Sequence, residues 1–189
     1  YYADENGKMA VGKKQIDGDW YYFKDWGGMY QNAFIKNGTS VCHAAADGKL
    51  TIGWLQQGST YYYFDETGEQ YFDRFFEYDN NTYRVNADGK MVTGFQTISG
   101  AKYYFASSGL MQTGWFKING TDYYATSSGA IKAQWVGSGN IWYYVDADGK
   151  MVTGYQTIAG AKYYFANSGL MQTGWFKINK EDYYAPSSG

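Results

Sequence analysis

The feature that most constrains this chain is a long internal duplication. Residues Gly89–Gly129 return sixty residues later as Gly149–Gly189, and the two 41-residue segments differ at only six positions. Inside this period runs a shorter one of about twenty residues, which is marked by a Gly-aromatic pair, a tight turn, a Tyr-Tyr pair and a Gly-containing connector. A unit this short cannot bury an apolar face by itself, so the copies must stack and share a core.

The repeat predicts an all-β fold, a solenoid of β-hairpins in which about three units complete one turn. We expect a single repeat array over residues 1–189, with a partial repeat at 1–11. The chain begins and ends in mid-repeat, which indicates a piece of a longer protein. The hairpin repeats are expected to start near nine residues: Gly12, Ala33, Gly53, Arg74, Gly94, Gly114, Gln134, Gly154 and Gly174.

The unit that starts at Gly114 shows why hairpins are expected. Asn119-Gly120 is a strong two-residue hairpin signal, and the register that it sets sends alternate side chains to opposite faces. One face is predicted to carry Trp115, Lys117, Asp122 and Tyr124, and the other, the candidate core, Phe116, Ile118, Tyr123 and Ala125. In the Ala33 unit the Asn37-Gly38 pair is displaced by one position, and we expect a bulge or register shift there.

The composition favours strands and turns and argues against several classes of function. The chain has 22 Tyr, 11 Phe and 7 Trp, and its net charge of −2 includes no basic block, so no nucleic-acid partner is expected. No apolar run is long enough to span a bilayer and no signal sequence is present, so no membrane insertion is expected. Cys42 is the only cysteine, which excludes an internal disulfide, and a small buried side chain is the expected role.

The sequence predicts neither catalysis nor a metal or cofactor site. Most carboxylates lie in connectors, where Asp and Gly serve turns, and an active site rarely recurs every twenty residues. His43, the sole histidine, has no nucleophile motif near it. The Asp-Ala-Asp-Gly run at 146–149 is similar to the start of a calcium loop but lacks the later ligands. We therefore expect a protein that is not an enzyme.

The order of motifs, Gly-Trp, then Trp-Tyr-Tyr or an equivalent, then Asp-Gly-Lys-Met, resembles the cell-wall-binding repeat superfamily over essentially the whole chain. This superfamily includes the choline-binding repeats of Gram-positive surface proteins, the glucan-binding repeats of glucansucrases and the C-terminal repeats of large clostridial toxins. The resemblance implies a hairpin solenoid, and in the choline-binding branch it implies cages of aromatic side chains around a quaternary ammonium.

Carried over to this chain, the resemblance implies three candidate sites. The first has Trp135, Trp142 and Tyr144 as walls, with small Gly137 opposite Trp142 and with Tyr155 of the next hairpin closing the pocket. The second candidate site consists of Trp54, Tyr61 and Tyr63. The third is weaker and includes Trp20, because Lys13 stands where an aromatic residue is expected.

Other units depart from the cage pattern, because Lys or Asp replaces the aromatic residue before Tyr-Tyr at Lys102, Asp122, Lys162 and Asp182. These units are more similar to the glucan-binding and toxin branches. The predicted function is a secreted or bacterial cell-surface module that binds a choline-bearing cell-wall polymer or a polysaccharide. The alternatives are a glucan- or host-glycan-binding repeat region and a spacer or adhesin whose aromatic residues only join hairpin to hairpin.

Overall fold

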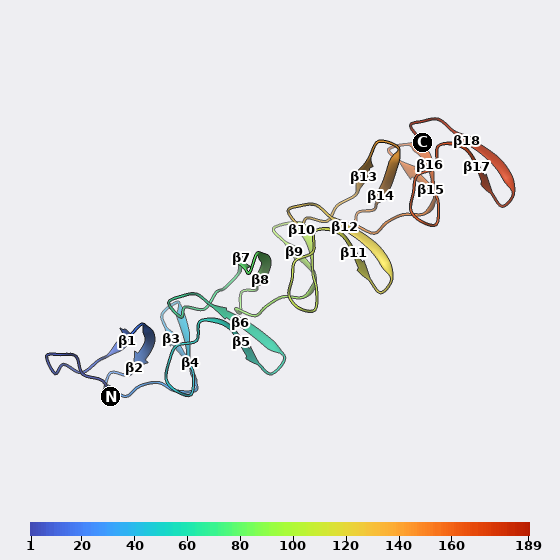
Figure 1. Cartoon of the computed structure of the whole chain (residues 1–189). Helices are drawn as coiled ribbons and strands as arrows, with labels where there is room; N and C mark the ends of the chain where they lie inside the picture. Colours follow the sequence, from blue (N-terminus) through green and yellow to red (C-terminus); the bar gives the residue numbers. More distant parts are fainter. The chain divides into compact units, whose positions relative to one another are not determined.

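The computed structural model describes all residues from 1 to 189 and consists of nine antiparallel β-hairpins in succession (Figure 1). The predicted all-β fold of hairpin repeats is confirmed. The chain forms no helix with the length and apolar character that crossing a membrane would require. The eighteen strands are β1 (Gly12–Ile16), β2 (Asp19–Phe23), β3 (Ala33–Asn37), β4 (Ser40–Ala44), β5 (Gly53–Gln57), β6 (Thr60–Phe64), β7 (Arg74–Tyr78), β8 (Asn81–Val85), β9 (Gly94–Ile98), β10 (Ala101–Phe105), β11 (Gly114–Ile118), β12 (Thr121–Ala125), β13 (Gln134–Ser138), β14 (Ile141–Val145), β15 (Gly154–Ile158), β16 (Ala161–Phe165), β17 (Gly174–Ile178) and β18 (Glu181–Ala185).

The hairpins have the register that the turn residues predict. In β11–β12, Trp115 pairs with Tyr124, Phe116 with Tyr123 and Ile118 with Thr121. At the Asn119-Gly120 turn both central residues have positive φ, as a type I′ turn requires, and this turn matches the right-handed twist of the strands. That single register is maintained in all nine hairpins.

The prediction of a bulge or register shift in the Ala33 unit is wrong. The β3–β4 hairpin is regular, with Ile35 paired with Cys42 and Asn37 paired with Ser40 across a Gly38-Thr39 turn. Gly38 has a φ of 63° and occupies the first central position, which is the glycine position of a type II′ turn. Asn37 is therefore the last strand residue rather than the first turn residue, and the register does not shift.

The core repeats with the hairpins. The last residue of the second strand is at most 3% exposed in the first eight hairpins: Phe23, Ala44, Phe64, Val85, Phe105, Ala125, Val145 and Phe165. This position points to the predicted core face. The side chain at this position varies among Phe, Val and Ala, so neighbouring side chains must differ as well to keep the interior filled.

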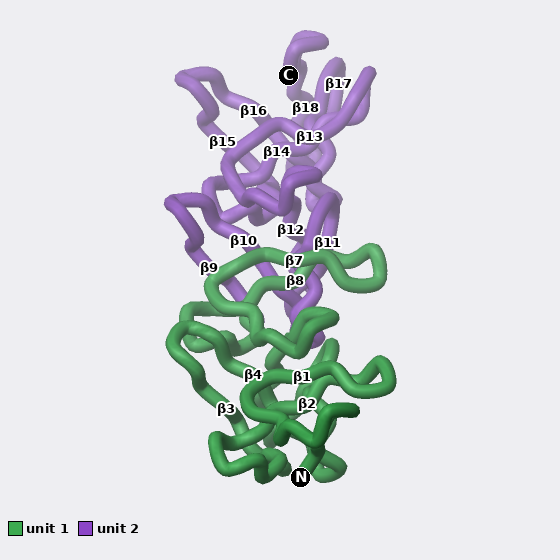
Figure 2. The backbone as a smooth tube through the Cα atoms, turned by 90° about the vertical axis from the view of Figure 1, so that its left-hand side faces the viewer, with its two compact units in different colours: residues 1–92 green, residues 93–189 purple.

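Within each unit, backbone hydrogen bonds join a hairpin to the connector that follows the next one. In unit 2 (Thr93–Gly189), Met171 N–H donates to the Trp142 carbonyl at 2.8 Å and Met151 N–H to the Asp122 carbonyl at 2.9 Å. In unit 1 (Tyr1–Val92), Met91 N–H donates to the Tyr61 carbonyl at 2.8 Å in the same way. Figure 2 shows the two units. This bond fixes how far one hairpin is advanced along the next, and so determines which side chains meet between them.

Candidate functional site

Within a unit, the step from one hairpin to the next builds a recurring local arrangement, which we call a slot. A slot is bounded by the second residue of each strand in one hairpin and by the third residue of the second strand in the next hairpin. An apolar connector residue, held by the backbone bond described above, completes it. Each slot is named after the residue at the second position of the second strand, and unit 2 contains the Lys102, Asp122 and Trp142 slots.

The Trp142 slot is a mainly aromatic hollow of about 350 Å³. The Trp135 and Tyr163 rings meet edge to face, with centroids 4.9 Å apart at 71°. The Trp142 indole Nε1 donates to the Gly139 carbonyl at 2.7 Å, which holds this ring beside the β13–β14 turn. None of the lining side chains carries a charge: Trp135, Trp142, Tyr163, Met171, Ser187 and Ser188. A guest in this hollow would therefore meet ring faces, a thioether and hydroxyl groups.

The structure brings Trp135 and Trp142 together, but it places the other two predicted residues of this site differently. Tyr144 supports Trp135 from outside the hollow, with ring centroids 5.2 Å apart. Tyr155 does not line the hollow and packs on Tyr164 at 4.9 Å. The wall supplied by the next hairpin is Tyr163, which sequence reasoning assigned to the core. The recurrent Tyr-Tyr pair was the available signal, because its first member is the third residue of the second strand in seven of the nine hairpins.

Gly137 has another role than leaving room for a guest. Its φ is 147°, and a Cβ atom there would lie 2.0 Å from the Ile141 carbonyl oxygen. A side chain is thus excluded by the backbone of the partner strand. The glycine lets β13 approach β14 closely just before the turn that holds the Trp142 indole.

The Asp122 slot has the same construction twenty residues earlier in the chain, with a volume of about 250 Å³. Trp115 and Tyr143 meet at 5.4 Å and 73°, almost as their equivalents do in the Trp142 slot. The carboxylate of Asp122 replaces one aromatic wall, and it accepts a hydrogen bond from Lys117 Nζ at 2.6 Å. The lining residues are Trp115, Asp122, Tyr143, Met151 and Ser168.

The Lys102 slot is occupied by the chain itself. Lys102 Nζ lies 4.4 Å from the centroid of the Phe95 ring and donates to Asp148 Oδ1 at 2.8 Å. The hydrogen bond and the charge of Lys102 lower the pKa of Asp148. An internal ammonium therefore sits where the Trp142 slot has open space.

In unit 1 the predicted group of Trp54, Tyr61 and Tyr63 does come together, with Trp54 5.2 Å from Tyr63 and 6.5 Å from Tyr61. Further rings from the next hairpin pack on Trp54, and their centroids lie between 5.1 and 6.2 Å away: Phe76, Tyr78 and Tyr83. Burial raises the pKa of Tyr63, the neighbouring hydroxyls adding to the effect. Ligand binding at this group stays a prediction, and its ring faces are largely used by neighbours.

Trp20 is covered by a cation of the chain. Lys13 Nζ lies 5.1 Å from the Trp20 ring centroid and 2.6 Å from Glu69 Oε1. Burial favours the neutral form of Glu69, but hydrogen bonds from Lys13 and Ser40 outweigh it and lower the pKa of this carboxyl. The Lys13 ammonium thus already occupies the position at Trp20 that an external cation would need.

The same network is expected to keep the Cys42 thiol unreactive. Its side chain is buried, and burial together with the negative charge of Glu69 raises the pKa of the thiol to about 11. Because the thiolate is the reactive form, we expect a disulfide reagent at pH 8 to modify the native protein at least about 100-fold more slowly than the denatured chain. The measurement is the release of the reagent's chromophore with and without denaturant. Equal rates in the two states would contradict this.

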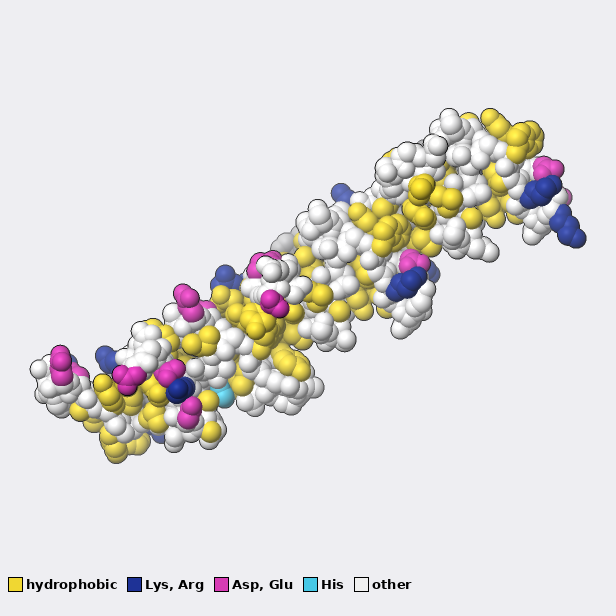
Figure 3. Space-filling view, viewed as in Figure 1, with side chains coloured by type: hydrophobic (Ala, Val, Ile, Leu, Met, Phe, Trp, Pro, Cys, Tyr) yellow, Lys and Arg dark blue, Asp and Glu magenta, His cyan; other side chains and the backbone are white.

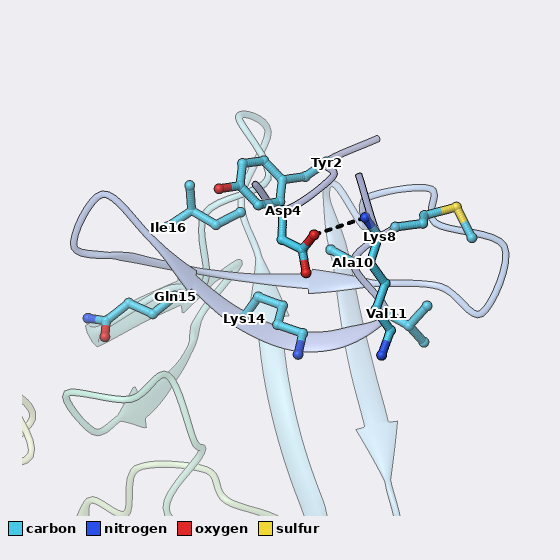
Figure 4. Close-up of a pocket in the computed structure, with 9 residues that line it drawn as sticks. Tyr2, Asp4, Lys8, Ala10, Val11, Lys14, Gln15 and Ile16 are labelled. Atoms are coloured by element: carbon cyan, nitrogen blue, oxygen red, sulfur yellow. Dashed lines mark hydrogen bonds between the residues drawn. The ribbon is translucent and has the colours of Figure 1, made fainter. Parts of the chain in front are cut away.

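Two other hollows lack open aromatic walls. The first, of about 480 Å³, lies between β1 and the preceding segment, and Tyr2 is its one aromatic lining residue (Figure 4). There Asp4 Oδ1 accepts the backbone N–H of Lys8 at 2.9 Å and so serves the local turn. The second hollow includes Trp26 and Tyr30, and Lys24 Nζ lies 5.2 and 5.1 Å from their ring centroids.

Comparison with protein families gives a match in both units. The model described as "Choline-binding repeat" matches residues 92–135 and 152–189. The model described as "Putative cell wall binding repeat" matches residues 14–29, 52–69, 73–91 and 134–151. Residues 30–51, which include the β3–β4 hairpin, lie outside the matched ranges. No curated protein matches the chain.

Solved structures extend the likeness to the full length. CbpJ from Streptococcus pneumoniae TIGR4 is 30% identical, covers 100% of this chain over 83% of its own and superimposes with a TM-score of 0.82. Choline binding protein F from Streptococcus pneumoniae, solved in the presence of a peptidoglycan analogue, is 27% identical over 95% of this chain and 86% of its own, with a TM-score of 0.67. The choline-binding domain of CbpL from Streptococcus pneumoniae is 27% identical over 96% of both chains, with a TM-score of 0.66. Since the repeat models match both units and the likeness to CbpJ spans the whole chain, the chain belongs to the choline-binding repeat family, a family of cell-wall-binding modules.

Proposed function

We propose that this chain is a non-catalytic module that holds a secreted or surface protein to the bacterial cell wall by binding choline groups of a cell-wall polymer. The observation that carries the proposal is the Trp142 slot, whose three aromatic walls surround an uncharged hollow of about 350 Å³. A quaternary ammonium is attracted to ring faces and has no N–H group that needs a hydrogen-bond acceptor. The slot offers this cation the environment that it requires.

The size of the expected affinity follows from the number of walls. Each cation–π contact contributes about 0.5–2 kcal/mol, so three rings give a few kcal/mol and a dissociation constant of about 1 mM. A polymer that carries many choline groups would meet several chains or several sites at once, and effective concentration would then raise the overall affinity. Weak single sites are thus compatible with firm attachment to a wall.

The first test is a titration with choline, followed by tryptophan fluorescence and by the melting temperature. We expect a saturable signal, a rise in melting temperature as the site fills, and a loss of affinity of at least about tenfold in Trp142→Ala. Trp175→Ala is the matched control, because Trp175 holds the position of Trp135 in β17 but is 76% exposed and has Tyr184 as its neighbour.

Dextran and a host-type glycan run in parallel separate the alternatives. A glycan response without a choline response would replace the proposal by carbohydrate binding. No response to choline, dextran or the host-type glycan would favour a spacer whose aromatic rings only join the hairpins. Unchanged choline affinity in Trp142→Ala would remove the Trp142 slot from consideration even if the chain binds choline.

A further inference from the structure

The Asp122 slot differs from the Trp142 slot in one property that decides which cation it can hold. The two share a Trp, a Tyr from the next hairpin, a Met and a connector Ser, and the Trp–Tyr edge-to-face contacts agree within 0.5 Å, at 5.4 and 4.9 Å. Asp122 introduces a carboxylate where the other slot has an indole. We propose that the Asp122 slot is a second binding site, selective for a primary ammonium group rather than for a quaternary one.

The carboxylate supplies what a primary ammonium needs. Such a group carries three N–H donors, and leaving water without replacement acceptors is costly. Asp122 can accept a charge-assisted hydrogen bond while the Trp115 and Tyr143 rings attract the positive charge. A quaternary ammonium has no donor to offer, and its methyl groups hold the charge away from the carboxylate oxygens.

The Trp142 slot gives the opposite preference. Its lining residues include no carboxylate, and their side-chain oxygens are the hydroxyls of Ser187, Ser188 and Tyr163. A primary ammonium there would lose hydrogen bonds to water, whereas a quaternary ammonium loses none. The pair of slots therefore divides cations by the number of N–H groups that they carry.

Lys117 is the internal competitor in the Asp122 slot. It contacts Asp122 Oδ1 at 2.6 Å, yet the Lys117 side chain is 64% exposed, and exposed ion pairs are weak and screened by salt. An ionised carboxylate has two oxygens with about four acceptor positions, so Asp122 can hold Lys117 and a ligand together. Lys117 should therefore lower the affinity of the slot for a ligand without closing the slot. Lys102 differs, because its ammonium lies over the Phe95 ring of the Lys102 slot.

The test compares ethanolamine with choline, which have the same skeleton and differ in the three N-methyl groups. The readout is the indole N–H signal of Trp115 and of Trp135 in NMR spectra of the ¹⁵N-labelled full chain, with signals assigned by Trp→Phe variants. We expect ethanolamine to shift the Trp115 signal at least about tenfold more effectively than choline does, with the reverse order at Trp135. Glucosamine as a second probe separates an amino sugar from an amino alcohol as the source of the ammonium.

Three variants make the result specific. Asp122→Asn should weaken the ethanolamine response at Trp115 by about tenfold or more, and Lys117→Met should strengthen it. Asp182→Asn is the matched control, because Asp182 pairs with Lys177 at 2.7 Å in the same way, beside the exposed Trp175. All three variants should leave choline binding at Trp135 unchanged. Failure of the primary-ammonium proposal at the Asp122 slot can therefore be distinguished from failure of the proposed choline-binding function. The proposal is overturned if neither amine shifts the Trp115 signal in Lys117→Met, or if Asp122→Asn binds ethanolamine as the unmodified chain does.

Discussion

Phe165→Ala is expected to lower the free energy of unfolding of unit 2 by about 3–5 kcal/mol, the usual cost of removing a fully buried phenyl ring. Phe165 is 0% exposed at the end of β16, and Trp135 packs on it with ring centroids 5.8 Å apart. The cavity would therefore also loosen a wall of the Trp142 slot, and choline affinity should fall together with stability. Denaturant unfolding followed by tryptophan fluorescence measures the first effect, and the choline titration measures the second.

A second substitution should repair part of this damage, because another hairpin fills the same two core positions with a small and a large side chain in exchanged places. The last residue of the second strand and the third residue of the first strand are diagonal neighbours on the core face. In β15–β16 the diagonal neighbour of Phe165 is Gln156. In β11–β12 the diagonal neighbour of Ala125 is Phe116, and Ala125 and Phe116 share one buried cluster with Ile131. In unit 1, Ala44 and Ile35 of β3–β4 share a buried cluster in the same way.

Gln156→Phe in the Phe165→Ala background should thus recover about 1–3 kcal/mol, since it recreates the β11–β12 pair inside β15–β16. Tyr155→Ala is the control for loss of an aromatic ring, because Tyr155 is 60% exposed and its removal should cost less than about 1 kcal/mol. No recovery in the double variant would show that the two positions do not fill a common volume.

Local rules explain how much of the fold could be predicted from the sequence. A two-residue turn and a period of two fix a hairpin's register without reference to the rest of the chain, so the pairing of Trp115 with Tyr124 followed from Asn119-Gly120 alone. The one error has a local cause as well. Asn37-Gly38 is a strong type I′ signal, but Gly38 serves equally well at the first position of a type II′ turn, and strands of equal length then result.

The candidate site was harder to predict because it lies between hairpins. Trp135 and Trp142 sit on one hairpin and were found together, but which residue of the next hairpin faces them depends on how the two are stacked. That offset is set by the bond from Met171 N–H to the Trp142 carbonyl, a contact between residues 29 positions apart in the sequence. It brings Tyr163 to the slot and leaves Tyr155 exposed. Hydrophobic side chains reach the surface at many places along the chain (Figure 3), and the exposed aromatic ones include Trp115, Tyr155 and Trp175.

Sequence pattern also could not show which slots are already filled. The sequence showed only that lysines replace aromatic residues of the cage pattern, and in the structure two of these lysines supply a cation to a neighbouring ring. Lys13 lies over Trp20 and Lys102 over Phe95, each held by a carboxylate from a later connector. The number of sites open to an external ligand therefore depends on charges contributed by distant parts of the same unit.

The largest expected gain of function comes from exchanging the wall that distinguishes the two open slots. Asp122→Trp combined with Lys117→Gly reproduces the β13–β14 arrangement, in which Trp142 stands opposite Gly137. We expect the number of choline molecules bound per chain to rise by one, and the new site to bind choline about 5–30-fold more tightly than the Asp122 slot does, because a third ring adds about 1–2 kcal/mol. Calorimetric titration with choline gives both numbers.

Trp142→Asp is the reciprocal change and should remove the original choline site while leaving Trp135 in contact with Tyr163. If the number of sites does not rise in a well-folded variant that combines Asp122→Trp with Lys117→Gly, the identity of these two residues is not sufficient. The remaining difference would then be the backbone at Gly137, where a φ of 147° and the bond from the Trp142 indole to the Gly139 carbonyl hold the ring beside the turn. The exchange thus decides whether ligand choice in these repeats is set by one side chain on a common frame, or by that side chain together with the hairpin that orients it.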